Sequence, residues 1–343
     1  ALGKHMSQGG GVLDWSGRLA GGYLAYTNLT MGPVLNFYSS KNFNFNLRRF
    51  NSATHFEVLN GIGVMISQPL NSGNSLSSNH NVTLHLRMAD RIIIDASDPE
   101  WVRDSDYPAV QETNLGLSWQ WLNRRPETDL ASFPRGGGGV SAHMETTLPQ
   151  IYGEGDYQKI WLEGFLNLKI PKTPFVFYNR SKWEYQNGNI PAQDSIGFMT
   201  TTPIYFSAGT ILNIAQTGFY DLPESYNLRG QTSDYPGTSL IYNVSELRIP
   251  LFKSLPAHFL GIKLSGFTGA LFHDFGYLPE SEETLSTMGA EVKFNLSIGN
   301  VALVTLSTGI GGDTDYWQTV IDDPNEFDFS EDYYFRMALV NPF

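Results

Sequence analysis

Apolar and polar residues alternate along most of the chain from Val12 onward, which is the spacing of β-strands and not of helices. In the clearest example, residues 159–170, one face carries Ile160, Leu162, Leu166, Leu168 and Ile170 and the other carries Lys159, Glu163, Asn167 and Lys169. The same spacing occurs in residues 82–88, 115–121, 140–146 and 291–298. Such strands suit either the core of a soluble sandwich or a barrel whose apolar face meets lipid.

The lengths of the predicted connections distinguish these two settings. Over the last five predicted strands, the longer connections 222–238, 277–286 and 312–332 alternate with the shorter ones 252–258 and 299–300. Outer-membrane barrels have long outer loops and short periplasmic turns, whereas a sandwich has no reason to sort its loops in this way. We therefore predict an all-β fold, an antiparallel transmembrane β-barrel of the bacterial outer-membrane type.

The length of the chain limits the number of strands. Transmembrane strands of about 9–11 residues allow about 14 to 16 strands, and we predict about 16. The candidates in the first hundred residues are 12–19, 22–30, 32–39, 42–50, 54–68 and 81–95. We expect residues 1–11 to be a linker or an expression remnant and residues 12–343 to be a single barrel domain. The start of the chain suggests a mature protein or an excised C-terminal domain.

Composition excludes several classes of function. Charged residues make up 16% of the 343 residues and aromatic residues 13%, and the charged fraction is below the about 25% of a soluble domain. The net charge of −12 argues against a nucleic-acid partner, because phosphates are bound by clustered Lys and Arg. The chain has no cysteine, so disulfides and thiolate metal sites are excluded, and no apolar run is long enough for a transmembrane helix.

The C-terminus is predicted to be a strand from Tyr333 to Phe343. One face of this strand carries Tyr333, Phe335, Met337, Leu339, Asn341 and Phe343. A chain that ends in Phe on an alternating aromatic strand resembles the recognition signal of bacterial outer-membrane barrels. Asn341 departs from this pattern, because an apolar residue is usual there.

Three motifs lie between Tyr226 and Gly276. They are Leu228-Arg-Gly230, Tyr242-Asn-Val-Ser-Glu-Leu-Arg-Ile-Pro250 and Phe272-His-Asp-Phe-Gly276, and Arg124-Arg-Pro-Glu-Thr-Asp129 and Phe133-Pro-Arg-Gly136 precede them. In this order they resemble motifs of the outer-membrane insertase superfamily, the bacterial surface antigen family that includes BamA and TamA. The resemblance covers about residues 112–343. Leu228 replaces the usual Val, and Gln231 replaces the usual aromatic residue.

Strand parity places Glu246 and Asp274 on the polar faces of neighbouring predicted strands. A guanidinium has five donors in a rigid fork, so Arg229 can bridge two carboxylates. We expect, as the resemblance also implies, that the loop with Arg229 and Gly230 folds into the barrel and that Arg229 pairs with Glu246 and Asp274. Phe272 and Gly276 belong to the strand motif of the family. The alternative is a solvated Arg229 beside ordinary lumen charges.

The resemblance implies insertion, assembly or translocation of proteins at the bacterial outer membrane, without ATP and without enzymatic activity. It implies a weakly paired seam between the first and last strands. The expected partners are outer-membrane lipid and lipopolysaccharide, unfolded outer-membrane or secreted protein clients, and a periplasmic domain or accessory proteins. POTRA domains, which the family usually carries, are expected upstream of these residues or are absent. No cofactor and no metal are expected.

Two other classes of function remain open. One is a passive porin or an anchor barrel for a missing periplasmic domain. The other is an outer-membrane barrel hydrolase, although the sequence has no Gly-x-Ser-x-Gly elbow and no metal-binding histidine spacing. The acidic connection 312–332 could bind calcium, but it lacks the spacing of a calcium loop, and a solvated loop is expected.

Overall fold

A computed structural model describes most of the chain. The described residues are 5–13, 20–28, 33–50, 53–70, 78–96, 109–125, 136–191, 196–198, 204–206, 225–226, 228–231, 233, 235–259, 262–298, 302–326 and 333–340. None of the helices within these ranges is both long and apolar enough to cross a membrane.

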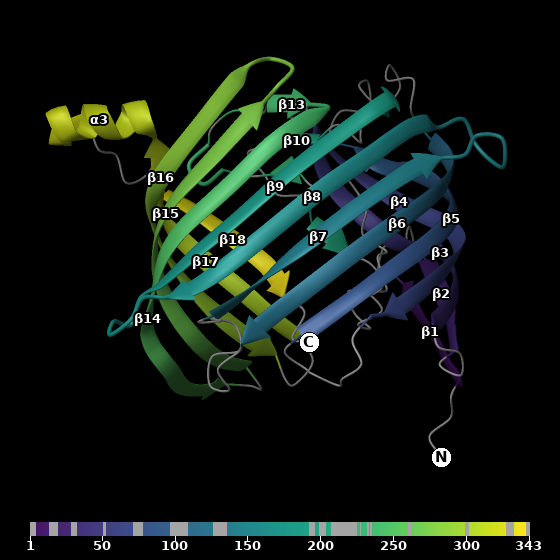
Figure 1. The fold of residues 1–343 in the computed structure, drawn as a ribbon, viewed down its shortest axis with the longest axis horizontal. Helices are drawn as coiled ribbons and strands as arrows, with labels where there is room; N and C mark the ends of the chain where they lie inside the picture. The colour runs from purple at the N-terminus through teal and green to yellow at the C-terminus, as the bar shows by residue number, and fades with distance from the viewer. Residues whose placement is uncertain are drawn as a thin grey trace.

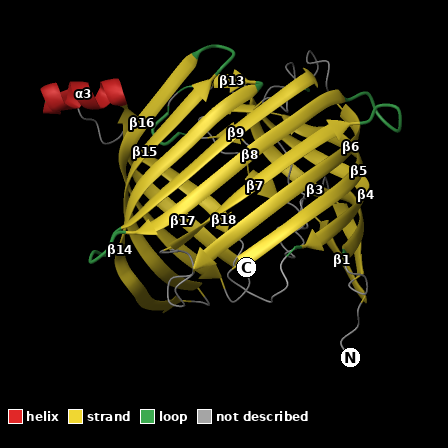
Figure 2. Cartoon of the chain, in the orientation of Figure 1, coloured by secondary structure: helices red, strands yellow, loops and turns green. Residues whose placement is uncertain are grey.

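Among the described residues, fourteen strands form one continuous antiparallel path. Figures 1 and 2 show the curved sheet that they make. They are β1 (His5–Leu13), β2 (Ala20–Asn28), β3 (Val34–Phe50), β4 (Ala53–Pro69), β5 (Ser78–Ala96), β6 (Ala109–Arg125), β7 (Gly136–Thr147), β8 (Asp156–Lys169), β9 (Val176–Asn189), β14 (Ser239–Phe259), β15 (Ile262–Leu278), β16 (Glu283–Ile298), β17 (Ala302–Asp313) and β18 (Tyr333–Val340). The prediction of an all-β chain with a large antiparallel sheet is confirmed. The predicted number of about 16 strands is not, because the path contains 14.

Four short strands lie between β9 and β14. They are β10 (Ile196–Phe198), β11 (Ile204–Phe206), β12 (Ser225–Tyr226) and β13 (Tyr235–Gly237). Strand β11 pairs with β3, whereas β10 pairs with both β12 and β13 in a separate small sheet. Helix α3 (Thr314–Asp322) and the 3-10 helix η3 (Pro324–Glu326) follow β17.

The large sheet curves strongly, and its two edges are β1 and β18 (Figure 1). Within the described strands, β1 pairs only with β2 and β18 pairs only with β17, so the sheet is not closed. Each strand runs antiparallel to the one before it. An even number of strands therefore brings the start of β1 and the end of β18 to the same end of the sheet, and α3 to the opposite end.

The strand faces have the polarity opposite to that of a soluble protein. Large apolar side chains are exposed on alternate positions, including Leu84, Leu117, Trp121, Met144, Leu162, Trp183, Ile241 and Leu271. Charged side chains are buried on the opposite face, including Arg91, Glu112, Glu145, Lys159, Lys182, Glu184, Glu246, Asp274 and Glu291. This distribution is the one expected of a sheet whose outer surface meets hydrocarbon and whose inner surface is polar.

Several strand boundaries differ from those predicted, and β-bulges explain two of the differences. Strand β3 includes both predicted strands 32–39 and 42–50, and its pairing with β4 shifts register between Ser40 and Asn44. Strand β14 runs through the predicted connection 252–258, where the pairing with β15 shifts twice. A bulge inserts an extra residue and breaks the period-two pattern, so a bulged strand looks like two strands in the sequence.

Three other segments also differ from the expectation. The predicted loop 277–286 is only a turn between Leu278 and Glu283, because the strands β15 and β16 extend further than their apolar residues indicate. Strand β1 occupies most of the stretch 1–11 that was expected to be a linker, and three consecutive glycines hide its alternation. The predicted strand 12–19 lies largely outside the described residues.

Candidate functional site

The Leu228–Gln231 turn lies against the inner face of β14 and β15. Leu228 is fully buried in an apolar cluster with Ile196, Phe198, Leu240, Tyr242, Val244 and Leu278. The cluster joins the turn and β10 to the inward-facing side chains of the sheet. The backbone N–H of Gln231 donates to the Leu228 carbonyl at 3.1 Å, and the side-chain amide of Gln231 donates to the Phe198 carbonyl at 3.1 Å. These contacts hold the turn on the polar inner face of the sheet.

Gly230 allows the turn to approach β17. Its φ of +84° lies in the left-handed region that favours glycine. A Cβ atom at this position would lie 2.3 Å from the carbonyl carbon and oxygen of Gly311. The Arg-Gly sequence therefore combines a buried cation with the one residue type that fits beside the β17 backbone.

The Arg229 side chain binds three carboxylates from three adjacent strands. Its Nε donates to Asp274 Oδ2 at 2.8 Å, and its Nη2 donates to Asp274 Oδ1. Its Nη1 donates to Glu246 Oε1 at 2.7 Å and to Glu291 Oε1 at 2.6 Å. The backbone N–H of Arg229 also donates to Asp274 Oδ2, at 3.1 Å. The structure thus brings together Arg229, Glu246 and Asp274, and it adds Glu291 on β16.

The burial and charge of this group determine its electrostatics. The relative exposures of Arg229, Asp274 and Glu246 are 2%, 0% and 4%. Burial alone would lower the pKa of the Arg229 guanidinium, but its hydrogen bond to Asp274 and the charges of the three carboxylates hold that pKa well above its ordinary value. The guanidinium also stacks 3.7 Å from the centre of the Phe272 ring.

Two further cations complete the cluster. Lys293 Nζ lies 3.0 Å from Glu246 Oε1 and 2.6 Å from Glu291 Oε1, and Arg248 Nε donates to Glu246 Oε2. The described cluster therefore contains three cations (Arg229, Arg248 and Lys293) and three carboxylates (Glu246, Asp274 and Glu291). Its formal charges balance, which is what a buried group of ions requires. We call these six side chains the Arg229 cluster.

Sequence reasoning missed Glu291, although a signal for it was present. Glu291 and Lys293 share the polar face of the alternating segment 291–298. Both residues therefore point to the side of the sheet that also carries Glu246 and Asp274. The sequence analysis assigned the Arg229 fork to two carboxylates, whereas Nη1 alone serves two of the three.

Gly276 makes room for the inner elements. A Cβ atom there would lie 2.6 Å from the Phe198 ring of β10. Together with Phe272, Gly276 lies in the strand motif identified in the sequence, on the face of β15 that contacts the turn and β10. The motif residues therefore surround the Arg229 cluster.

The last strand also reaches the Arg229 cluster. The Tyr334 hydroxyl donates to Glu291 Oε2 at 3.0 Å, and the Tyr334 ring packs edge-on against Phe272, with 6.2 Å between ring centres. Tyr333 and Phe335, from the predicted C-terminal signal, point to the opposite, exposed face of β18. Met337 and Leu339 lie in β18, but their side chains are outside the description, and so is Phe343.

A second buried polar network lies on the inner face of β5–β9. Glu145 accepts a hydrogen bond from Asn114 Nδ2 at 2.6 Å and lies 3.2 Å from His85 Nε2. The rings of His85 and His143 stack with 5.7 Å between their centres. In the described part of the chain, no three His, Asp or Glu side chains are arranged to hold a metal ion.

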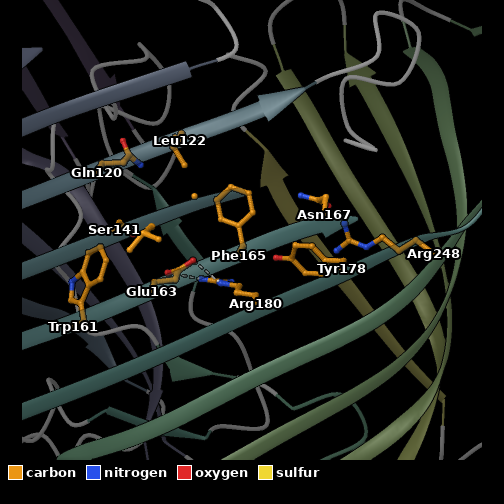
Figure 3. A pocket seen from close by; sticks show the side chains of 12 residues that line it. Gln120, Leu122, Ser141, Trp161, Glu163, Phe165, Asn167, Tyr178, Arg180 and Arg248 are labelled. Atoms are coloured by element: carbon orange, nitrogen blue, oxygen red, sulfur yellow. Dashed lines mark hydrogen bonds and ion pairs between the residues drawn. The ribbon is translucent and has the colours of Figure 1, made fainter. Parts of the chain in front are cut away.

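The structure also contains a pocket of about 470 Å³. Figure 3 shows side chains that line it. It is lined by Gln120, Leu122, Gly139, Val140, Ser141, Trp161, Glu163, Phe165, Asn167, Tyr178, Arg180 and Arg248. Arg180 forms a two-pronged pair with Glu163, at 2.8 and 3.2 Å. Arg248 stacks 3.6 Å from the centre of the Tyr178 ring and also pairs with Glu246, so the pocket borders the Arg229 cluster.

Comparisons with known proteins give a distant likeness to solved structures. No protein-family model matches the sequence, and no curated protein matches it. The crystal structure of BamA from Haemophilus ducreyi lacking POTRA domains 1–3 is 14% identical, with a TM-score of 0.46 over 90% of this chain and 66% of that chain. CdiB from Acinetobacter baumannii is 10% identical, with a TM-score of 0.45 over 90% of this chain and 53% of that chain.

This chain therefore spans less than two thirds of the length of either structure.

Proposed function

We propose that the chain is a bacterial outer-membrane β-barrel that assists the insertion, assembly or translocation of proteins, without ATP and without catalysing a covalent step. The observation that carries this proposal is the turn held by Arg229 on the polar inner face of a sheet whose outer face is apolar. The proposal requires that the strands cross a membrane, that the turn lies inside the barrel and that β1 and β18 can separate. Different observations support these three requirements.

The membrane is supported by the exposed apolar side chains of the strands. Leu162, Leu166 and Leu168 on β8 are 47%, 42% and 49% exposed, whereas Lys159 and Asn167 of the same strand are each 2% exposed. In water this arrangement would leave apolar surface solvated and charges buried, both at a cost in free energy. In a bilayer the apolar side chains contact acyl chains. We therefore place the start of β1 and the end of β18, which lie at the same end of the sheet, in the periplasm. Helix α3, at the opposite end, then lies at the cell surface.

The inward turn is the feature that a passive pore does not need. Four buried charges, two partly buried cations and an apolar cluster hold the turn on the inner face of the sheet, next to the last strand. A pore conducts through an open lumen, so contacts that hold a turn on its inner face do not help conduction. A protein that rearranges its terminal strands needs an internal element that contacts both the wall and β18, and the Arg229 cluster contacts both.

The seam is supported by the edges of the sheet, where β1 and β18 each pair with a single described strand. An unpaired edge in hydrocarbon leaves backbone N–H and C=O groups without partners, at a cost of several kcal/mol for each group. We infer that β1 and β18 pair weakly in the membrane and separate to accept a client strand. An extended client segment would pair with an open edge by β-augmentation, in which backbone hydrogen bonds supply affinity without a fixed sequence.

Reconstitution tests this function. The chain is inserted into vesicles, and a urea-unfolded outer-membrane barrel is added as client without nucleotide. We expect the client to fold faster than in vesicles of the same lipid without the chain. Equal folding rates, together with a large and steady conductance, would instead support a passive pore.

A further inference from the structure

Helix α3 differs from the other described elements because it projects away from the sheet (Figures 1 and 2). It begins after Asp313, whose carboxylate caps the helix by accepting a hydrogen bond from the Tyr316 N–H at 2.6 Å. It ends at Asp323, whose N–H donates to the Thr319 carbonyl at 2.8 Å. The helix is therefore a defined element with both ends satisfied, located at the end of the sheet away from the chain termini.

The helix has one apolar side. At 3.6 residues per turn, Tyr316, Trp317, Val320 and Ile321 share one face, and Thr314, Asp315, Gln318, Thr319 and Asp322 share the other. No residue of the helix is buried, and Ile321 is 72% exposed. Tyr316, Trp317 and Val320 are partly buried, whereas Ile321 extends away from the described part of the chain.

The helix is attached to the outer face of β16 at Ser286 and Met288. The Trp317 indole N–H donates to the Met288 carbonyl at 2.7 Å, and the Thr314 hydroxyl lies 3.3 Å from the Ser286 hydroxyl. Thr287 and Glu291 of β16 are buried on the inner face, so the residues with even numbers face outward. The helix is thereby held beside the outer wall of the sheet and not above the lumen.

The outward residues of β16 change from apolar to polar between Met288 and Ser286. Met288, Ala290 and Val292 are apolar, and Val292 is 37% exposed. Beyond them, Ser286 and Thr284 are polar, and Ser286 is hydrogen-bonded to His273 of β15 at 2.9 Å. Trp317 therefore lies where the apolar belt of β16 ends. Trp and Tyr side chains favour this position at a membrane–water boundary.

We propose that α3 lies flat in the headgroup region of the outer leaflet, with its apolar stripe toward the acyl chains and Asp315 and Asp322 toward water. The inference rests on the proposed function only in taking the strands to span a membrane. An interfacial helix buries its apolar face about 5–10 Å into the boundary between headgroups and acyl chains. The polar face carries no Lys or Arg, so the contact depends on apolar burial and does not require anionic lipid.

Single-cysteine labelling tests this orientation, because the natural chain contains no cysteine. The variants Ile321→Cys and Gln318→Cys carry an environment-sensitive fluorophore on opposite sides of α3. Each is reconstituted in phosphatidylcholine vesicles with and without lipids that bear a nitroxide on the upper acyl chain. We expect the Ile321→Cys label to be quenched about twofold or more relative to the Gln318→Cys label.

A third variant separates this inference from the proposed function. Leu271 faces outward on β15 and is 60% exposed, so a label on Leu271→Cys reports whether that strand crosses the bilayer. Strong quenching of this label, with equal and weak quenching of both α3 labels, would overturn the helix inference alone. A Leu271→Cys label that is not quenched would overturn both. An apolar environment at Ile321→Cys without lipid quenching would point to a second copy of the chain as the occupant and would also overturn the inference.

Discussion

Replacing Arg229 with alanine gives the largest predicted effect on the inward turn. The substitution leaves three carboxylates of the Arg229 cluster facing only two cations. Asp274 suffers most, because it is 0% exposed and, among the described residues, its carboxylate bonds to Arg229 alone. We expect the turn to leave the inner face much more often than in the natural chain.

The size of the effect follows from the burial of the pair. Removing one partner of a buried ion pair costs about 3–5 kcal/mol, because the remaining charge keeps its desolvation penalty without the compensating attraction. One factor of ten in an equilibrium corresponds to about 1.4 kcal/mol, so opening of the turn should increase by about 100-fold to 5,000-fold. Arg229→Lys keeps the charge but loses the fork, and we expect an intermediate increase.

Amide hydrogen exchange measures this opening directly. The backbone N–H of residue 229 donates to Asp274, and that of Gln231 donates to the Leu228 carbonyl, so peptides over residues 228–231 report the closed state. Arg180→Ala is the matched control. It removes a two-pronged pair whose side chains are 32% and 20% exposed, and such pairs contribute about 0–1 kcal/mol. Unchanged exchange over 228–231 in Arg229→Ala would show that Arg229 does not hold the turn.

Three further substitutions test separate contacts. Gly230→Ala places a left-handed alanine against the β17 backbone, at a cost of about 1–2 kcal/mol, and should speed exchange over the same peptides. Gly136→Ala is the control, because a Cβ there has nothing within 4 Å, and it should leave the exchange unchanged. Tyr334→Phe removes the hydrogen bond to the Glu291 carboxylate, worth about 1.5 kcal/mol, and should speed amide exchange in β18. The outward substitution Tyr333→Phe is the control and should have a smaller effect. Equal effects would show that this hydrogen bond does not hold β18. Gly276→Ala overpacks the β10 phenyl ring and should destabilise the inner elements by about 1–3 kcal/mol in urea titrations, and an unchanged midpoint would contradict the packing.

Strands could be predicted from the sequence where apolar and polar residues alternate regularly. Segments such as 159–170 and 291–298 show both faces clearly in the sequence, and the structure places Leu162, Leu166 and Val292 outward. Prediction failed where the strand pairing shifts register, as in β3 and β14, because the extra residues interrupt the regular alternation on which the prediction relied. It also failed for β1, whose three glycines carry no side chain that shows a face.

The candidate site was predictable to the extent that it depends on strand parity. Parity alone puts Glu246 and Asp274 on one surface, and the family resemblance supplies Arg229 as their partner. Tyr334 and Phe198 were not predictable. Tyr334 reaches the Arg229 cluster from β18 and Phe198 reaches the apolar cluster around Leu228 from β10, both through contacts between segments far apart in the chain. Neither β10 nor its pairing with β12 and β13 has a sequence signal, since strands of two or three residues show no period.

The rate of client folding with and without the Arg229 contacts tests whether the inward turn is needed for function. Vesicles that carry equal amounts of the natural chain, Arg229→Ala or Arg180→Ala receive the same unfolded outer-membrane client, and folding is followed by gel mobility. Insertion of each variant is checked first by exchange protection in β14–β16. We expect the natural chain and Arg180→Ala to accelerate folding, and we expect the rate with Arg229→Ala to fall to that of empty vesicles. Equal acceleration by the natural chain and a correctly inserted Arg229→Ala would contradict this expectation.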